Sequence, residues 1–182
     1  MIQILKDSDT RPWFFLQTAH TTYGMWVMET GHLEHLYYGE RITVDSQDPS
    51  SCAPLVIQRA FAPGNTCTYD REHPQISMED VCLEVGTLGK GDIREPFLEV
   101  RFADGSVTSD FTFDSYEIIT LKEREQCLQD SGLPHSYSEV GTDSAECLQI
   151  VLQDVTNHLE LQLLYTVFEE CDVITRSARL IN

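Results

Sequence analysis

The stretch LELQLLYTV, residues 159–167, alternates between apolar and polar side chains and decides the fold class. Apolar side chains occupy the odd positions from Leu159 to Val167, whereas Glu160, Gln162 and Thr166 fall between them. Side chains alternate between the two faces of an extended chain, so this pattern predicts a long β-strand with one buried face.

The same two-residue period recurs on both sides of this stretch. It predicts strands at 23–27, 98–102, 111–113, 118–120 and 148–152, with Pro96 beginning the second of them. Residues 173–181 are also expected to form a strand. Turn sequences separate several of these segments: ETGH at 29–32, ADGS at 103–106 and a weaker turn at 156–158. A helical composition occurs at 122–130. The sequence therefore predicts an all-β protein with a β-sandwich architecture.

Two long segments, 45–95 and 123–146, lack such alternation and are expected to form loops, the first of them functional or contact-making. The predicted strand at 173–181 runs to the last residue, Asn182, without a closing turn. An open strand edge invites association. We therefore expect residues 1–182 to be one β-sandwich domain of a longer protein.

The composition narrows the classes of partner. Thirty acidic residues against twelve basic ones give a formal net charge of −18, which argues against binding to nucleic acid or to an anionic membrane surface. The start of the chain has no secretory pattern, and no apolar run approaches a membrane span. The six cysteines are widely spaced, without a C-x-x-C pair. We expect a cytoplasmic protein with free thiols.

Metal-binding and catalytic patterns are weak. His32 and His35 would fall on opposite faces of a strand, and the spacing of Cys67, His73 and Cys82 is too wide for a zinc site. The glycines of GTLGKG, residues 86–91, do not lie between a strand and a helix as a phosphate loop requires. We expect no metal and no cofactor.

Four motifs, in order along the chain, carry a family resemblance. GHLEHLYYG at 31–39, GDIREP at 91–96, GLP with a tyrosine at 132–137, and YTVF followed by DVITRS at 165–177 resemble segments of the N-terminal domain of family 36 α-galactosidases. The resemblance implies part of a β-supersandwich, similar to galactose mutarotase, that precedes a (β/α)8 barrel and a small β-domain.

The family's activity is the retaining hydrolysis of terminal α-galactosides such as melibiose and raffinose, which uses two carboxylates. Both are barrel aspartates, the nucleophile within a Lys-Trp-Asp motif. Trp13 and Trp26 are the two tryptophans here, and neither is followed by aspartate. The resemblance therefore implies no catalytic residue in this chain, which is not expected to be active without its own barrel.

The resemblance also implies homo-oligomers, commonly tetramers, in which a loop of this domain reaches a neighbouring subunit's pocket. A family stretch similar to D-R-A-F-S-P corresponds to residues 58–63, which makes Gln58, Arg59 and Phe61 the candidate substrate-binding residues. Gln58 replaces an aspartate that contacts sugar in some members. Asp92 and Arg94 are expected instead to organise a turn through a charge-assisted hydrogen bond.

Two other functions fit the sequence. A free-standing carbohydrate-binding β-sandwich would present an exposed aromatic platform, for which Tyr37, Tyr38 and Tyr69 are candidates. An epimerase related in fold to galactose mutarotase would need a His-and-Glu constellation, for which the adjacent Glu34 and His35 are candidates.

Overall fold

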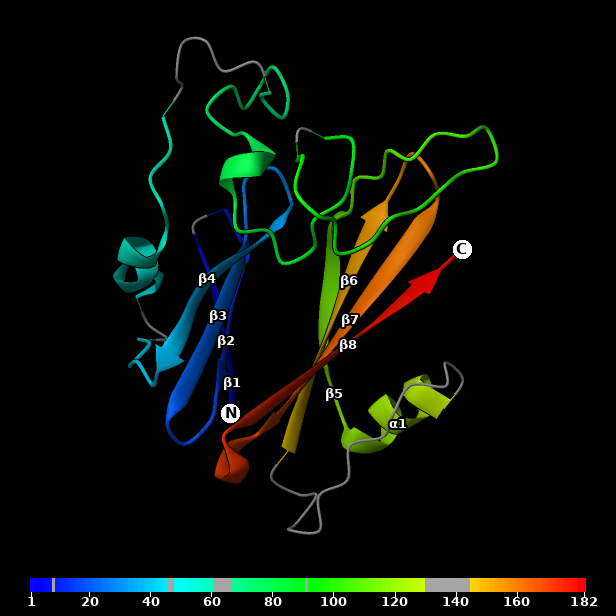
Figure 1. Cartoon of the computed structure of the whole chain (residues 1–182). Helices are drawn as coiled ribbons and strands as arrows, with labels where there is room; N and C mark the ends of the chain where they lie inside the picture. Colours follow the sequence, from blue (N-terminus) through cyan, green and yellow to red (C-terminus); the bar gives the residue numbers. More distant parts are fainter. Residues whose placement is uncertain (8, 46–47, 61–66, 91, 130–144) are drawn as a thin grey trace.

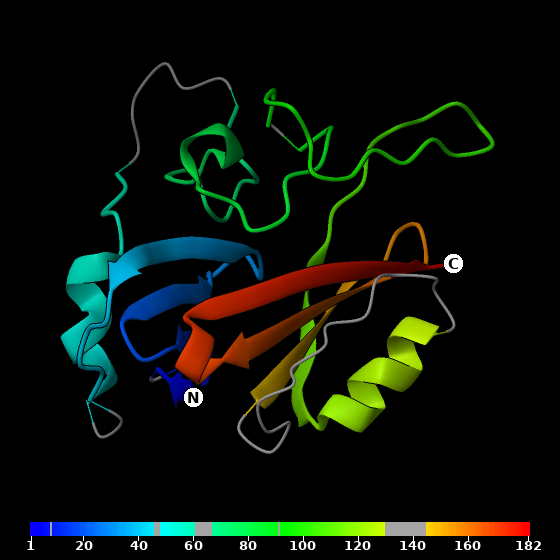
Figure 2. The same ribbon diagram turned by 60° about the horizontal axis from the view of Figure 1, so that its bottom comes forward.

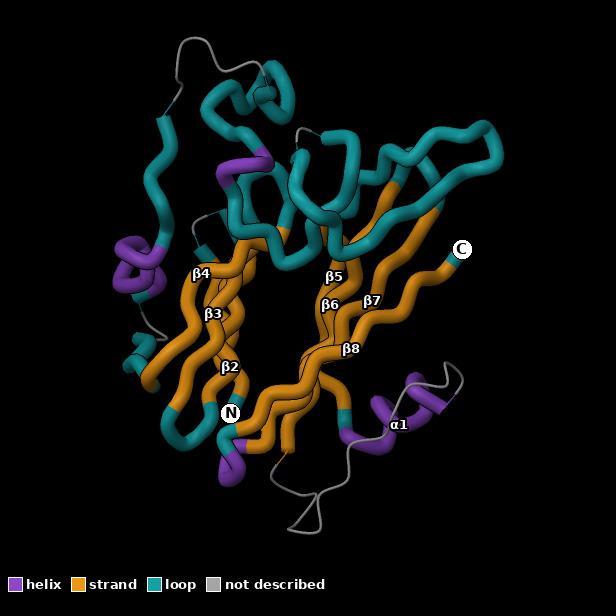
Figure 3. Tube along the Cα trace, in the orientation of Figure 1, coloured by secondary structure: helices purple, strands orange, loops and turns teal. Residues whose placement is uncertain are grey.

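The computed structural model describes residues 1–7, 9–45, 48–60, 67–90, 92–129 and 145–182. It contains two four-stranded antiparallel sheets (Figures 1 and 3). The first sheet has the order β1 (Ile2–Lys6), β2 (Pro12–Gln17), β3 (Thr21–Val27), β4 (Leu33–Glu40). The second has the order β5 (Thr112–Ile119), β6 (Ala145–Asp154), β7 (Leu159–Phe168), β8 (Val173–Ile181). The predicted all-β sandwich is confirmed.

The main core lies between the two sheets. Phe14 and Leu16 of β2 and Met25 of β3 meet Ile150 of β6 and Leu163 of β7, and all five are fully buried. The odd positions of β7 face this core, as the alternation predicts. Fully burying one such side chain stabilises the fold by about 1.5–3 kcal/mol, so this face fixes the pairing of the two sheets.

Each sheet is also covered on its outer face (Figure 2). Helix α1 (Leu121–Gln129) lies over the second sheet, where Leu121 contacts a buried cluster of Ile119, Cys147 and Leu164. This contact explains why Leu164, an even position of β7, is buried as well. On the first sheet, the short 3-10 helix η1 (Pro49–Leu55) and its neighbours cover Leu5, Trp13 and Phe15.

The predicted hairpin turn at 29–32 joins β3 to β4. Met28 N–H donates to the carbonyl of His32 at 2.8 Å, and Gly31 adopts a positive φ of 83°. Glycine reaches this left-handed region without a steric penalty, so the turn sequence and the backbone agree.

The strand predicted at 98–102 is wrong. Residues 96–102 form no ladder, and the one bridge in this stretch pairs Leu98 with Thr87. Pro96 therefore begins an irregular segment. The alternation still has a cause, because Leu98, Val100 and Phe102 contact the main core from the end of the sandwich. The turn at 103–106 is present, with Phe102 N–H donating to the Ser106 carbonyl at 2.9 Å.

The long segment between β4 and β5 crosses one end of the sandwich (Figure 1). Its described parts hold η1 and a second 3-10 helix, η2 (Met78–Asp80), and otherwise irregular chain. It touches the first sheet where Leu83 bridges Glu34, which covers the beginning of the β4 edge. Within the described ranges, no helix has the length and apolar character that a membrane crossing requires.

Candidate functional site

The segment that follows η1 exposes the first candidate residue, Gln58. Val56 is extended, with φ −84° and ψ 128°, and ends the 3-10 helix. Ile57 is 62% exposed, and Gln58 is exposed next to it. An uncharged amide at the surface can both donate to and accept from hydroxyl groups.

Arg59 points the other way, into the protein. Its guanidinium forms an ion pair with Glu34 of β4, with Nη1 3.3 Å from Oε2 and Nη2 in contact with Oε1. The Glu34 side chain is 1% exposed, and it also accepts from the indole N–H of Trp26 at 2.8 Å. Because a buried carboxylate needs paired donors, this contact makes Arg59 an anchor for the segment. Phe61, the third candidate, lies outside the described residues.

Two adjoining clefts lie between this segment and the outer face of the first sheet. We call them together the tryptophan groove, lined by the η1 segment (residues 48–59), the β1–β2 turn, and β2 and β3. The larger cleft has a volume of about 470 Å³ and is lined by Asp7, Arg11, Trp13, Trp26, Asp48, Ser50, Ala53, Val56 and Gln58. The smaller, about 260 Å³, shares Arg11, Trp26, Val56 and Gln58 with it. Gln58 therefore stands between the two lobes.

Asp92 and Arg94 form the ion pair expected from the sequence. Arg94 donates from Nε to Asp92 Oδ1 at 2.8 Å and from Nη2 to Oδ2 at 2.9 Å. The side-chain hydrogen bonds of Arg94 hold the pKa of Asp92 below its usual range, against the effect of burial. Arg94 Nη2 also donates to the carbonyls of Met78 and Val81, so the pair ties this turn to the η2 region.

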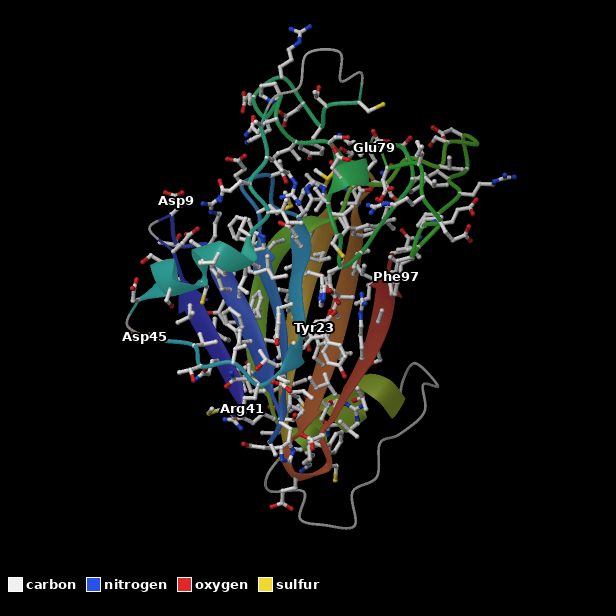
Figure 4. All side chains as sticks on the ribbon, turned by 60° about the vertical axis from the view of Figure 1, so that its left-hand side comes forward. Asp9, Tyr23, Arg41, Asp45, Glu79 and Phe97 are labelled. Carbon is white, nitrogen blue, oxygen red and sulfur yellow. The ribbon has the colours of Figure 1, made fainter. Side chains whose placement is uncertain are left out.

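A buried network around Glu84 was not foreseen from the sequence. The Glu84 carboxylate accepts from the hydroxyls of Tyr23 at 2.7 and 2.8 Å and of Tyr165 at 2.6 Å. Arg176 Nη1 lies 3.0 Å from Glu84 Oε1. Burial and the neighbouring Glu84 charge raise the pKa of both tyrosines. Tyr23 lies on the side of the molecule where β4 and β8 run (Figure 4).

This network bears on the epimerase hypothesis. His35 Nδ1 is 3.9 Å from Glu84 Oε2, so the histidine and a glutamate do meet. That glutamate is Glu84, however, and its oxygens are already engaged by two tyrosines and Arg176. Glu34, the glutamate adjacent to His35 in sequence, is engaged by Arg59. Neither carboxylate is open to a substrate.

A second, partly buried cluster centres on Asp110. His32 Nε2 lies 2.9 Å from Asp110 Oδ1, and the hydroxyl of Tyr69 donates to Oδ2 at 2.9 Å. Burial raises the pKa of Asp110, but the hydrogen bond and charge of His32, the Tyr69 hydroxyl and Lys90 lower it, with a net shift below the usual range. Tyr69 is thereby held against the protein and forms no exposed platform. Among the described residues, no group of histidine, cysteine and acidic side chains is arranged to hold a metal.

Comparisons with known proteins agree with this architecture. A family model described as "Glycosyl hydrolase family 36 N-terminal domain" matches residues 31–182. The chain is 40% identical over 171 residues to the bifunctional α-galactosidase/sucrose kinase AgaSK of Mediterraneibacter gnavus, and 34% identical over 169 residues to the α-galactosidase AgaA of Geobacillus stearothermophilus. Both alignments cover 93% of this chain but only 17% and 21% of those proteins.

The solved structures give the same result. The galactosidase domain of AgaSK matches with a TM-score of 0.76 and 34% identity, over 98% of this chain and 23% of that chain. AgaA of G. stearothermophilus in complex with raffinose gives a TM-score of 0.75 at 28% identity, over 93% of this chain and 22% of that chain. The chain spans about a fifth of the length of the relatives that it matches. It belongs to the glycosyl hydrolase family 36 N-terminal domain family.

Proposed function

We propose that residues 1–182 are the non-catalytic N-terminal domain of an α-galactosidase that hydrolyses terminal α-galactosides, of the melibiose and raffinose type, with retention. The family match and the α-galactosidase relatives support this proposal. The two fully buried carboxylates described above, Glu34 and Glu84, are occupied by neighbouring donors, which is consistent with catalytic acids that lie in the barrel domain of the same protein.

We further propose that the domain supports a homo-oligomer, a tetramer, and lines the active site of a neighbouring subunit with the stretch that begins at Gln58. The observation that carries this proposal is the opposite orientation of two adjacent residues. Arg59 is held by the buried Glu34, whereas Gln58 is exposed. A fixed backbone that presents a polar side chain outward suits a contact with a substrate in another chain. Because the backbone is already ordered, binding costs little further conformational entropy.

A reducing compartment, the cytoplasm, is part of the same proposal. Cys82 and Cys171 are exposed and, like the buried Cys52, form no disulfide. Thiols that persist unpaired at a surface are typical of proteins that work where glutathione keeps them reduced.

The test is a chimaera in which this chain replaces the matching N-terminal residues of the M. gnavus AgaSK. We expect the chimaera to hydrolyse a chromogenic α-galactoside, and the isolated chain to show no turnover. In the chimaera, Gln58→Ala should raise the KM about 2–10-fold, the effect of one lost hydrogen bond to substrate. Gln58→Asp, which restores the aspartate of the resembling motif, should lower the KM.

Gln126→Ala is the matched control, since Gln126 is an exposed glutamine on α1, over the other sheet. Turnover by the isolated chain would contradict the non-catalytic assignment. An unchanged KM in the Gln58→Ala chimaera would contradict the proposed contact of Gln58 with substrate in a neighbouring subunit.

The alternative is a free-standing carbohydrate-binding module. The tryptophan groove favours it, since two tryptophans and Gln58 of this chain line a cleft of about 470 Å³. Two results together would favour this alternative: sugar binding by the isolated chain, and a chimaera whose KM does not change when Gln58 is replaced by alanine.

A further inference from the structure

We infer that the tryptophan groove is a binding site for a neutral pyranose sugar on the domain's own surface. The groove has the size of a ligand site, because its larger lobe of about 470 Å³ lies within the range of roughly 300–1,000 Å³ typical of small-molecule pockets. The second lobe, about 260 Å³, shares Trp26 and Gln58 with the lining of the first. A di- or trisaccharide fits such a two-lobed shape better than a single compact ligand does.

The wall of the groove is aromatic. Trp13 and Trp26, the two tryptophans of the chain, face the larger lobe with ring centroids 4.8 Å apart. The C–H groups on one face of a pyranose carry partial positive charge and are attracted to the electron-rich face of an indole. Trp13 is 5% exposed, and among the described residues its buried Nε1 has no hydrogen-bond acceptor. The accessible part of this apolar wall therefore belongs mainly to Trp26, which is half-buried.

Planar polar groups face this wall. Arg11 is held in place by Asp7 at 3.0 Å through Nε and by Asp9 at 3.0 Å through Nη2, and it lies over the Trp26 ring at 5.6 Å. Within the described part of the chain, its Nη1 and the amide of Gln58 have no hydrogen-bond partner. Guanidinium and carboxamide groups are flat, with adjacent donor or acceptor positions, so each can bridge two neighbouring hydroxyls of a sugar ring.

The charges favour an uncharged ligand. Arg11 is already neutralised by Asp7 and Asp9, and Asp48 adds a further carboxylate to the lining. On a chain with a formal net charge of −18, such a site repels phosphate and other anions. A polyhydroxylated neutral ligand meets the donors and acceptors without this penalty.

This inference goes beyond the proposed function, in which Gln58 contacts a substrate that another subunit holds. The residues that line the groove belong to this chain, so the isolated chain carries the whole proposed site. The isolated chain is therefore the right material for the test.

The experiment is a titration of the isolated chain with methyl α-galactoside and with raffinose, followed by tryptophan fluorescence. Both tryptophans line the groove, so the whole indole signal reports on it. We expect a saturable change with a Kd of about 1–10 mM, an ordinary affinity for a small exposed sugar site. Gln58→Ala and Trp26→Phe should each weaken binding at least about fivefold, the loss of one good contact. Gln126→Ala should leave the Kd unchanged.

A second measurement is needed if sugar binding does not change the tryptophan fluorescence. In ¹⁵N NMR spectra, sugar should shift the indole N–H resonances and the Arg11 side chain. If no resonance shifts up to about 50 mM sugar, a concentration well above the expected Kd, the inference is overturned. Shifts confined to residues outside the groove, or binding of inorganic phosphate in place of sugar, would overturn it too. The chimaera's KM does not depend on these outcomes, so the two proposals fail separately.

Discussion

The carboxylate of Glu84 is buried between elements of both sheets. It accepts hydroxyl hydrogen bonds from Tyr23 of β3 and Tyr165 of β7, and it pairs with Arg176 of β8. Arg176 also lies over the rings of Tyr165 and Phe97, at 5.7 and 4.7 Å. One charged group thus joins the first sheet, the second sheet and the loop that crosses their end. Removing any one of these donors leaves the buried carboxylate one interaction short, and the remaining donors do not replace it.

Tyr165→Phe should therefore destabilise the protein by about 2 kcal/mol, since it removes a buried hydrogen bond to a charged group while it keeps the ring. Urea denaturation of the two proteins measures the difference in the free energy of unfolding. Tyr116→Phe is the matched control, because Tyr116 makes ring contacts while its hydroxyl forms no hydrogen bond with any of the described residues. Its effect should stay within about 0.5 kcal/mol. Equal effects of both substitutions would contradict the role of the network.

Two hairpin turns from different sheets meet at the opposite end of the molecule. Asp172 adopts a left-handed conformation, φ 53°, between η4 (Glu169–Cys171) and β8. Its carboxylate accepts from the Thr18 hydroxyl at 2.8 Å and from the backbone N–H of His20 at 2.9 Å, both in the β2–β3 turn. The His20 ring nitrogen lies 2.7 Å away. The β7–β8 turn is thereby fixed to the first sheet.

These contacts give a pH prediction. The His20 side chain, the Thr18 hydroxyl and the His20 backbone lower the pKa of Asp172 to about 2 in the folded protein. The folded pKa lies below the ordinary value of about 3.9, so the contacts stabilise the fold above that pH and are lost as pH falls through about 2.

NMR titration of the Asp172 carboxyl should show this low pKa, and His20→Ala should move it upward toward the ordinary value. The pKa of Asp104, lowered by its own hydrogen bonds to Ser106, should stay where it is. An Asp172 that titrates near its ordinary pKa in both proteins would show that the two turns are not joined.

Element by element, the sequence predicted strands well where alternation coincided with a paired neighbour. It predicted β6 and β7 because their two faces differ in polarity. It failed at 98–102, because alternation reports which side chains are buried and not whether the backbone has a partner. The same limit applied to β2, where both faces of the PWFFLQ stretch are buried and no alternation appears.

At the scale of the whole molecule, the chain carries a formal net charge of −18. Such an excess keeps a protein dispersed in water but opposes compaction through self-repulsion. The local ion pairs offset this only in part, because surface pairs contribute little each.

Salt should therefore stabilise the domain. Raising NaCl from about 0.05 to 0.5 M shortens the Debye length to a few ångströms and screens the repulsion, so the Tm should rise by several degrees. Melting curves followed by circular dichroism measure the effect, and a control in sucrose of equal osmolality separates screening from solute exclusion. A Tm that falls with NaCl would mean that favourable ion pairs outweigh the repulsion.

For the candidate site, the sequence supplied Gln58 and Arg59 as substrate-binding candidates and Asp92 and Arg94 as a structural pair, but it did not show which of the first two faces outward. Only the folded chain turns Arg59 inward to Glu34 and leaves Gln58 exposed. Similarly, Tyr165 and Arg176 belonged to a family-like motif, and the structure shows that they serve the buried Glu84.

The sequence by itself determined the fold class and the family, because polarity that alternates with a period of two, and motifs in a fixed order, are properties of neighbouring residues along the chain. The tertiary structure decided which distant side chains meet: Glu84 with Tyr23, Tyr165 and Arg176, and the tryptophans of β2 and β3 with the η1 segment. The physical reason is that a buried charge or a groove is defined by its surroundings, and those surroundings come from segments that are adjacent only after the two sheets have packed.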